Sequence, residues 1–481
     1  TGKFQSSYWV DEDGRRLKPP IGDGLGLRTV GKSLLRGSNA MRGVHLNQPE
    51  CFISHTLSVV DIDDERISER MKHPNFAEIQ LGSYLAVPCF DPEHYQDLFD
   101  ETLSDQEADP FLTALEQQLR DGLIPQSVYD QLLATYKSTR KHTTANLSGI
   151  VQDIKKMLPV DDLRDRVLQD TPLHDYLYCQ YDLDPDGRYS LESLLRDAQD
   201  QGSSAEALAL EQAQQASRAI GLCDLSLHEK FPVLLASIGY TRDKSRPGEA
   251  VLRPFAARQD EFQRFKVPIP ITATRNEAMM FSLDPCRVVA FLKVNHLADS
   301  APIQTLSDKR LARAWLYQYL PVSTPESLCQ QKLGNHGPTN ASILVFRLLH
   351  TMTHLLMHAG KKYVGLEMDS LAEFLFPSAL SAAIYVSKHT QFSLGALVTT
   401  FRHDLGRWLT SVREGAATCL YDPVCRSHTG ACHACTYLKF SCQHHNRGLN
   451  RGVLLGASDI DGRGPLVGYW SSAVSSLLPR H

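Results

Sequence analysis

Five cysteines crowded into one short segment constrain this chain more than any other feature. They stand at positions 419, 425, 432, 435 and 442, whereas the remaining six of the eleven cysteines are scattered singly. Two cysteines separated by two residues, as at 432 and 435, can turn both sulfurs to one face of a tight turn, and two further thiolates complete a tetrahedron about a zinc ion. The odd number of cysteines and the clustering of five of them indicate one metal site and otherwise reduced thiols, and they argue against a disulfide framework.

The number of thiolates predicts a structural zinc ion, because four of them leave the metal no open position for catalysis. Spacing that is symmetrical about the central pair favours the ligand set Cys425, Cys432, Cys435 and Cys442. Cys419 is the alternative ligand, and His428 or His433 can substitute for a thiolate.

Length and composition bound the class of protein. A chain of 481 residues exceeds the size of one hydrophobic core, so several domains are expected. A net charge of −5 excludes an overall basic footprint, so any contact with nucleic acid must be a local patch. The sequence contains no apolar run of about eighteen residues, and its start at Thr1 lacks the pattern of a signal peptide. We therefore expect a soluble cytoplasmic protein without a membrane segment.

Apolar periodicity predicts a mixed α/β, multidomain fold. Helices are expected over residues 110–121, 125–137, 203–220, 286–293, 340–359 and 395–409, with Gly360 closing the fifth of them. An edge strand is expected over 267–274 and a short strand over 382–386. The organisation follows as a helix-rich N-terminal region over 1–230, a mixed α/β segment over 231–330 and a zinc-binding C-terminal α/β domain over 331–481.

A phosphate-loop pattern runs from Gly26 to Ser33 and includes Lys32. In a true phosphate loop the glycine amides cradle phosphates, the lysine reaches them and the serine holds magnesium. A mostly apolar run over 57–60 ends at Asp61 and is a candidate magnesium-binding strand. However, residues 14–20 are rich in Arg, Lys and Pro instead of forming the buried strand that must precede such a loop. An ATP-dependent nucleic-acid enzyme is therefore the alternative function.

Two further motifs are interpreted as structural. His350, His354 and His358 share one helix face, but Thr351 stands where zinc metalloproteases carry glutamate, so we expect packed core histidines that hydrogen-bond to the backbone. The segment from Asp182 to Gly187 imitates a calcium loop, yet its twelfth position is Ser193 instead of glutamate, and a turn is expected.

The residues around the cysteines resemble a known family. The carrying segments are Ala431-Cys-His-Ala-Cys435, His445-Asn-Arg-Gly-Leu-Asn-Arg451, Leu349-His-Thr-Met-Thr-His-Leu-Leu356, the block from Asn276 to Asp284, and Gly239-Tyr-Thr-Arg242. Together they cover about residues 231–456 and are similar to the four-cysteine domain at the C-terminus of MrfA-like DNA helicases and to the DrmB family of the DISARM anti-phage system. The family usually has Asp at the position of Asn450. The resemblance implies a non-catalytic, DNA-associated subunit of an antiviral defence complex that works beside a separate, DrmA-like helicase.

Basic residues near the cysteines allow two interpretations. Lys439, Arg447 and Arg451 are candidates for contacts with DNA phosphates, which need little beyond clustered Lys and Arg. Alternatively, the bases balance the net charge of about −2 that four thiolates give a zinc ion. The sequence leaves both interpretations open.

Overall fold

The structure is a computed structural model, and the residues that it describes form two compact units. It describes residues 9–10, 16–17, 53–86, 92–100, 118–120, 125–126, 128–129, 147, 149–159, 162–183, 186–241, 253–259, 261–387, 395–439 and 441–479. The phosphate-loop pattern and most of the helices expected over 110–137 lie outside these residues. One unit comprises Thr1–Val59 and Leu234–Thr274, and the larger unit comprises Val60–Val233 and Arg275–His481.

The boundaries between the two units fall within two long strands. Strand β5 (Leu222–Thr241) is divided after Val233, and strand β8 (Ile271–Leu283) after Thr274. The smaller unit also holds most of β3 (Ile53–Val60) and the short hairpin of β6 (Arg258–Gln259) and β7 (Phe265–Lys266). In the smaller unit, β1 (Trp9–Val10) pairs with β2 (Arg16–Leu17).

Helices dominate the first part of the larger unit. They are α2 (Asp64–Arg70), α3 (Phe76–Ala86), α4 (Pro92–Asp100), α7 (Leu163–Gln169), α8 (Thr171–Tyr181), α9 (Leu191–Asp200) and α10 (Ser204–Ile220). The last of these matches the helix expected over 203–220, and it ends at Gly221, whose φ of 78° suits a residue without a side chain. The mixed α/β class is confirmed.

The sheet joins distant parts of the chain in the order β3-β5-β8-β10-β9, with β4 (Arg188–Ser190) pairing with β5. Strands β9 (Leu371–Phe376) and β10 (Ser381–Val386) form an antiparallel pair in which Glu373 lies opposite Ile384. Every residue of β10 is buried, as expected of a central strand, and the strand predicted over 382–386 is confirmed.

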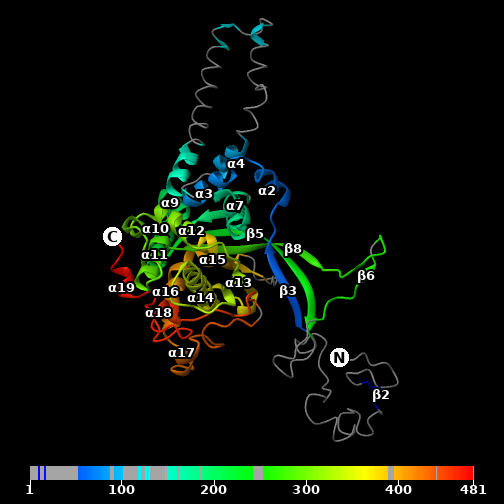
Figure 1. The fold of residues 1–481 in the computed structure, drawn as a ribbon, viewed down its shortest axis with the longest axis vertical. Coiled ribbons are helices and arrows are strands. Elements are labelled where there is room, and N and C mark those ends of the chain that lie inside the picture. Colours follow the sequence, from blue (N-terminus) through cyan, green and yellow to red (C-terminus); the bar gives the residue numbers. More distant parts are fainter. Residues whose placement is uncertain are drawn as a thin grey trace. The chain divides into compact units, whose positions relative to one another are not determined.

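Helix α14 (Pro338–Val364) is the spine of the larger unit, and nearly all of its residues as far as Met357 are buried. It contacts both β9 and β10 as well as the neighbouring helices α13 (Pro325–Cys329), α15 (Ala396–His403), α16 (Leu405–Ala417) and α18 (Gly452–Leu455) (Figure 1). The unit also contains α11 (Pro285–Val294), α12 (Lys309–Tyr319), α17 (Val424–His428), α19 (Ser472–Ser475) and the 3-10 turns Ile303–Leu306, Met368–Ser370 and Pro377–Ala379.

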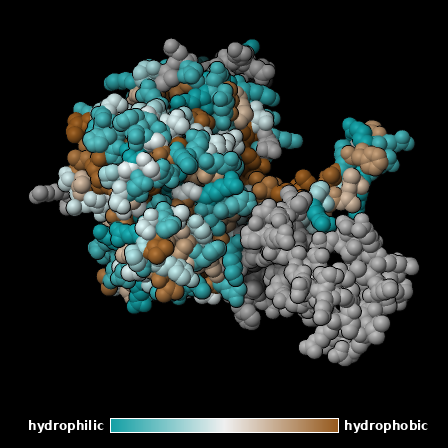
Figure 2. All heavy atoms as spheres, turned by 60° about the horizontal axis from the view of Figure 1, so that its bottom comes forward, coloured by the Kyte–Doolittle hydropathy of each residue, from teal (hydrophilic) through white to brown (hydrophobic). Residues whose placement is uncertain are grey.

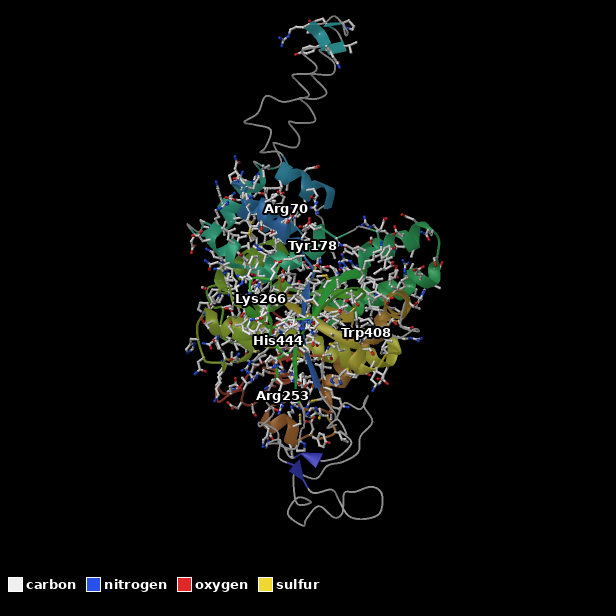
Figure 3. The ribbon with its side chains drawn as sticks, turned by 90° about the vertical axis from the view of Figure 1, so that its right-hand side faces the viewer. Arg70, Tyr178, Arg253, Lys266, Trp408 and His444 are labelled. Carbon is white, nitrogen blue, oxygen red and sulfur yellow. The ribbon has the colours of Figure 1, made fainter. Side chains whose placement is uncertain are left out.

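The expected end of α14 at Gly360 is wrong, because the helix continues to Val364 and is capped by Gly365, with φ 69°. Gly360 instead makes room for Trp408 of α16: a Cβ atom there would lie 2.5 Å from the indole ring. The indole of Trp408, labelled in Figure 3, also donates a hydrogen bond of 2.7 Å to the carbonyl of Leu356. The helix expected over 395–409 is likewise two helices, which meet at Asp404.

The surface of the larger unit is mixed. Figure 2 shows hydrophilic side chains over most of the visible face, with hydrophobic ones scattered among them. Among the described residues, no helix is long and apolar enough to cross a membrane.

Candidate metal centre

Four cysteines of the C-terminal segment meet at one point in the larger unit. Cys419 follows helix α16, Cys425 lies in the short helix α17, and Cys432 and Cys435 occupy the turn after it. One donor atom from each lies within 4.8 Å of every other, so the four side chains can hold a metal ion.

The separations of the sulfurs match a tetrahedral metal site. The Sγ atom of Cys432 lies 3.4 Å from that of Cys419 and 3.7 Å from that of Cys435. The Sγ atoms of Cys425 and Cys435 are 3.8 Å apart. Thiolates bound at about 2.3 Å to a zinc-sized ion are about 3.8 Å apart along the edges of a tetrahedron. A disulfide bond is about 2.05 Å long, and each of these cysteines is a free thiol.

Local backbone hydrogen bonds set this geometry. The carbonyl of Cys432 accepts from the amides of Cys435, Thr436 and Tyr437 at 2.9–3.1 Å, which folds the Cys-His-Ala-Cys turn tightly. Gly430 has φ 63°, and a Cβ atom there would lie 2.4 Å from Asn450. The turn therefore needs glycine at this position.

Arg451 braces the cysteine segment from inside, so the expectation that it contacts DNA is wrong. Its side chain is 2% exposed. The guanidinium donates to the carbonyls of Ala416 and Gly430 at 2.9 and 3.2 Å and to the carboxylate of Asp422 at 2.8 Å. It also lies 3.6 Å from the sulfur of Cys425. This position fits the other interpretation, in which a base balances the negative thiolates.

The thiols differ in how readily they ionise. Burial raises the pKa of Cys425 to about 12, although Arg451 acts in the opposite direction. Burial also raises the pKa of Cys435. For Cys432 the same desolvation is outweighed by hydrogen bonds, beginning with the amide of Ala434, and its pKa is lowered. Because a metal binds the thiolate, loading the site releases protons from the buried thiols.

The structure places Cys442 outside this group, in contrast to the ligand set that spacing favoured. Its sulfur lies 3.3 Å from Nε2 of His350, in a second buried group with His354 and Glu373. The alternative ligand Cys419 completes the first group. Spacing did not settle the choice because the chain turns back after Cys435: the side-chain amide of Asn446 bonds to both backbone groups of Leu438 at 2.8 Å.

The two candidate histidine ligands near the cysteines do not join the group. His428 and His433 are exposed, and His433 packs its ring edge-on against Tyr437. Lys439 and Arg447 are also exposed, and so is Arg426, the residue that follows Cys425. These bases therefore reach solvent, unlike Arg451.

Of the three histidines of α14, His350 and His354 are buried as expected and His358 is partly buried, but only part of their bonding was anticipated. Nδ1 of His354 lies 2.7 Å from the carbonyl of Thr436, which is the expected backbone contact. On the other side, the Nε2 atoms of His350 and His354 face Glu373 at 3.2 and 3.0 Å. Sequence reasoning missed Glu373, although a single acidic residue in the apolar strand Leu371–Phe376 was a usable signal.

Ionisation within this second group reflects deep burial. Burial lowers the pKa of His350 to about 4, so its ring is neutral at pH 7. For Glu373, burial opposes ionisation, but the two histidines outweigh it and its pKa is well below the usual range. Because both rings are completely shielded from water, the neutral form of His350 prevails.

The calcium-loop imitation is a structural element. Asp182 accepts two hydrogen bonds from Arg70, at 2.6 and 2.7 Å, and Ser193 bonds to Ser190 at the start of α9. Asp61, the candidate magnesium ligand, lies 3.7 Å from Arg275. Neither aspartate belongs to a group of potential metal ligands among the described residues.

Comparison with known proteins gives no family for the chain. No family model matches it. No curated protein matches it either.

Proposed function

We propose that this protein is a non-catalytic DNA-binding subunit of an antiviral defence complex, with a structural zinc ion held by Cys419, Cys425, Cys432 and Cys435. Zinc suits these ligands because it favours four thiolates in a tetrahedron, and such a site has no open position for substrate. In this proposal the ion fixes the C-terminal segment so that its basic side chains face the DNA backbone.

The observation that carries the proposal is the distribution of charge around the cysteines. Arg426, Lys439 and Arg447 are exposed, whereas the one acidic residue between positions 419 and 447, Asp422, is bound to Arg451. The exposed surface of this segment is therefore basic in a chain whose net charge is −5. Local bases of this kind provide sequence-independent affinity for phosphates.

The defence complex and the helicase partner enter the proposal through the resemblance to the DrmB family. A separate, DrmA-like helicase would supply the motor, and this subunit would extend the path of the DNA. The alternative, an ATP-dependent enzyme, needs the motif from Gly26 to Ser33 and is tested separately below.

The test is the salt dependence of DNA binding by the purified chain, alone and with its helicase. Replacing Arg426, Lys439 and Arg447 together with alanine should reduce the slope of log affinity against log salt by about two to three units. Binding at about 0.1 M salt should weaken on the order of a hundredfold, equally for all sequences.

A matched control changes the same charge elsewhere. Arg196, Lys361 and Arg407 are exposed on helices α9, α14 and α16, and replacing them with alanine should leave slope and affinity unchanged. Equal losses in both triple variants would mean that only total charge matters. An unchanged slope in the first variant would remove this surface from the DNA path.

A further inference from the structure

Four buried side chains from three parts of the larger unit converge beside helix α14. His350 and His354 come from that helix, Glu373 from β9 and Cys442 from the C-terminal segment. Their exposures are 0%, 0%, 1% and 7%, and one donor atom from each lies within 4.8 Å of every other. Such a set of donors with almost no access to water requires a chemical explanation.

The fold brings the donors together with little freedom. Residues four apart lie on one face of a helix, so His350 and His354 present neighbouring rings, whose centroids are 4.5 Å apart. Strand β9 pairs with β10 along its whole length, which fixes Glu373 beneath them. His444, labelled in Figure 3, packs edge-on against His350 at 5.6 Å and covers the group.

The contacts of His354 with a neutral ring leave one pair of acceptors facing each other. Nδ1 of His354 must carry its proton, because its neighbour at 2.7 Å is the carbonyl of Thr436, which can only accept. In the neutral ring Nε2 is then also an acceptor, yet it faces the carboxylate oxygen Oε1 of Glu373 at 3.0 Å. Two acceptors at this distance need a cation or an extra proton between them.

Two further polar atoms of these side chains are left without partners. Nδ1 of His350 and Oε2 of Glu373 are buried without a hydrogen-bond partner. The sulfur of Cys442 accepts from the amide of Asn446 at 3.2 Å, and this hydrogen bond favours a thiolate, whereas burial and the neighbouring Glu373 raise the pKa of the thiol. One donor atom of each side chain nevertheless faces the other three.

We propose that His350, His354, Glu373 and Cys442 bind a second divalent metal ion of the zinc class. Two neutral imidazoles, one carboxylate and one thiolate carry a charge of −2, which a divalent cation neutralises. Nitrogen, oxygen and sulfur together are ligands that zinc accepts in tetrahedral sites. Four protein ligands close the coordination sphere, so this ion is structural.

The separations of the donors agree with such a site. Ligand bonds of about 2.0–2.1 Å to nitrogen and oxygen give tetrahedral edges of about 3.3–3.4 Å, and an edge from nitrogen to sulfur is about 3.6 Å. The measured contacts are 3.0 and 3.2 Å from the histidines to Glu373 and 3.3 Å from His350 to Cys442. A small expansion of about 0.4 Å therefore accommodates the ion.

The second ion gives the C-terminal segment two anchors. Cys435 belongs to the first group and Cys442 to the second, and only six residues separate them. The first group cross-links the segment to itself, whereas the second joins it to α14 and to the sheet. This inference is independent of whether the segment binds DNA.

The decisive measurement is the metal content of the full chain, purified in reductant and counted by elemental analysis against protein concentration. We expect two zinc ions per chain in the wild type. Glu373→Gln, which keeps the shape of the side chain, should retain one, and Cys435→Ser should also retain one. Cys329→Ser is the matched control, because this buried cysteine bonds to the carbonyl of Glu326 outside both groups, and it should retain two.

Cobalt substitution of the wild type gives a readout that does not depend on the folding of variants. The intensity of the sulfur-to-cobalt charge-transfer band rises with the number of thiolate ligands. Two filled sites should therefore give one cobalt with four sulfurs and a second with one. A single metal ion per wild-type chain would overturn the proposal, as would a Glu373→Gln variant that folds and still binds two.

Discussion

Replacing Arg451 with alanine should loosen the cysteine segment from within the protein. The guanidinium is 2% exposed and holds four partners: the carbonyls of Ala416 and Gly430, the carboxylate of Asp422 and the sulfur of Cys425. Burial alone would lower the pKa of Arg451, but its hydrogen bonds to Asp422 and Cys425 raise it, so the side chain is always charged.

The loss of stability in Arg451→Ala can be estimated from the partner groups that remain without a donor. Removing one partner of a buried ion pair costs about 3–5 kcal/mol. The side chain of Asp422 is 23% exposed and can be hydrated after the change, so the lower end of this range applies. The two carbonyls that lose their donor cost about 1–3 kcal/mol each if they stay dry. We therefore expect a loss of about 3 kcal/mol in the local stability of the segment.

Hydrogen exchange of the metal-loaded full chain measures this local loss directly. The amides of Gly430 and Thr436 bond to the carbonyls of Cys425 and Cys432 and report on the two turns. A loss of about 3 kcal/mol should reduce their protection on the order of a hundredfold. The control is Arg447→Ala, an exposed base whose removal should change local stability by less than about 0.5 kcal/mol.

Arg451→Lys separates charge from geometry. Lysine keeps the positive charge but cannot reach two carbonyls and a carboxylate with one ammonium group, so protection should be only partly restored. Unchanged protection in Arg451→Ala, together with weaker DNA binding, would refute the reasoning and return this side chain to the DNA surface.

Four further predictions test other parts of the molecule. Cys419→Ser should lose one metal ion by elemental analysis, because the structure places this thiol in the four-cysteine group. Lys32→Ala should leave nucleotide binding by the isolated chain negligible and unchanged in a magnesium-dependent titration; micromolar binding that the substitution abolishes would favour the ATP-dependent alternative. Gly360→Ala should cost about 1–3 kcal/mol in chemical denaturation, because its Cβ would lie 2.5 Å from Trp408. Burial, with a smaller effect of Arg188, lowers the pKa of His228 to about 3. The unfolded chain therefore binds this proton first, so His228 should reduce stability from pH 6.5 downward by at most about 1.4 kcal/mol per pH unit. His228→Gln should reduce the total slope by that amount and leave the contributions of other buried histidines such as His350.

Local signals predicted much of the fold. Helix α10 has Gly221 directly after it, and the apolar pattern of α14 continues for most of its length, so both helices could be found from the sequence. Gly360 was misjudged because glycine serves two purposes, a left-handed cap or a close approach between helices, and only the position of Trp408 distinguishes them. The residues around Gly360 do not indicate that Trp408, almost fifty residues later in the chain, packs against it.

The division of the cysteines between the two candidate metal-binding groups could not be predicted from local sequence either. Crowded cysteines predicted a metal-binding group, because few other structures require so many thiols in so short a segment. Assigning each thiol needed the course of the backbone in space. Folding brings Cys442 beside two histidines and a glutamate that lie about seventy to ninety residues earlier in the chain. Spacing compares positions along the chain, whereas a metal ion selects donors by distance in space. For this reason the pattern identified the segment correctly and still divided its cysteines differently from the folded protein.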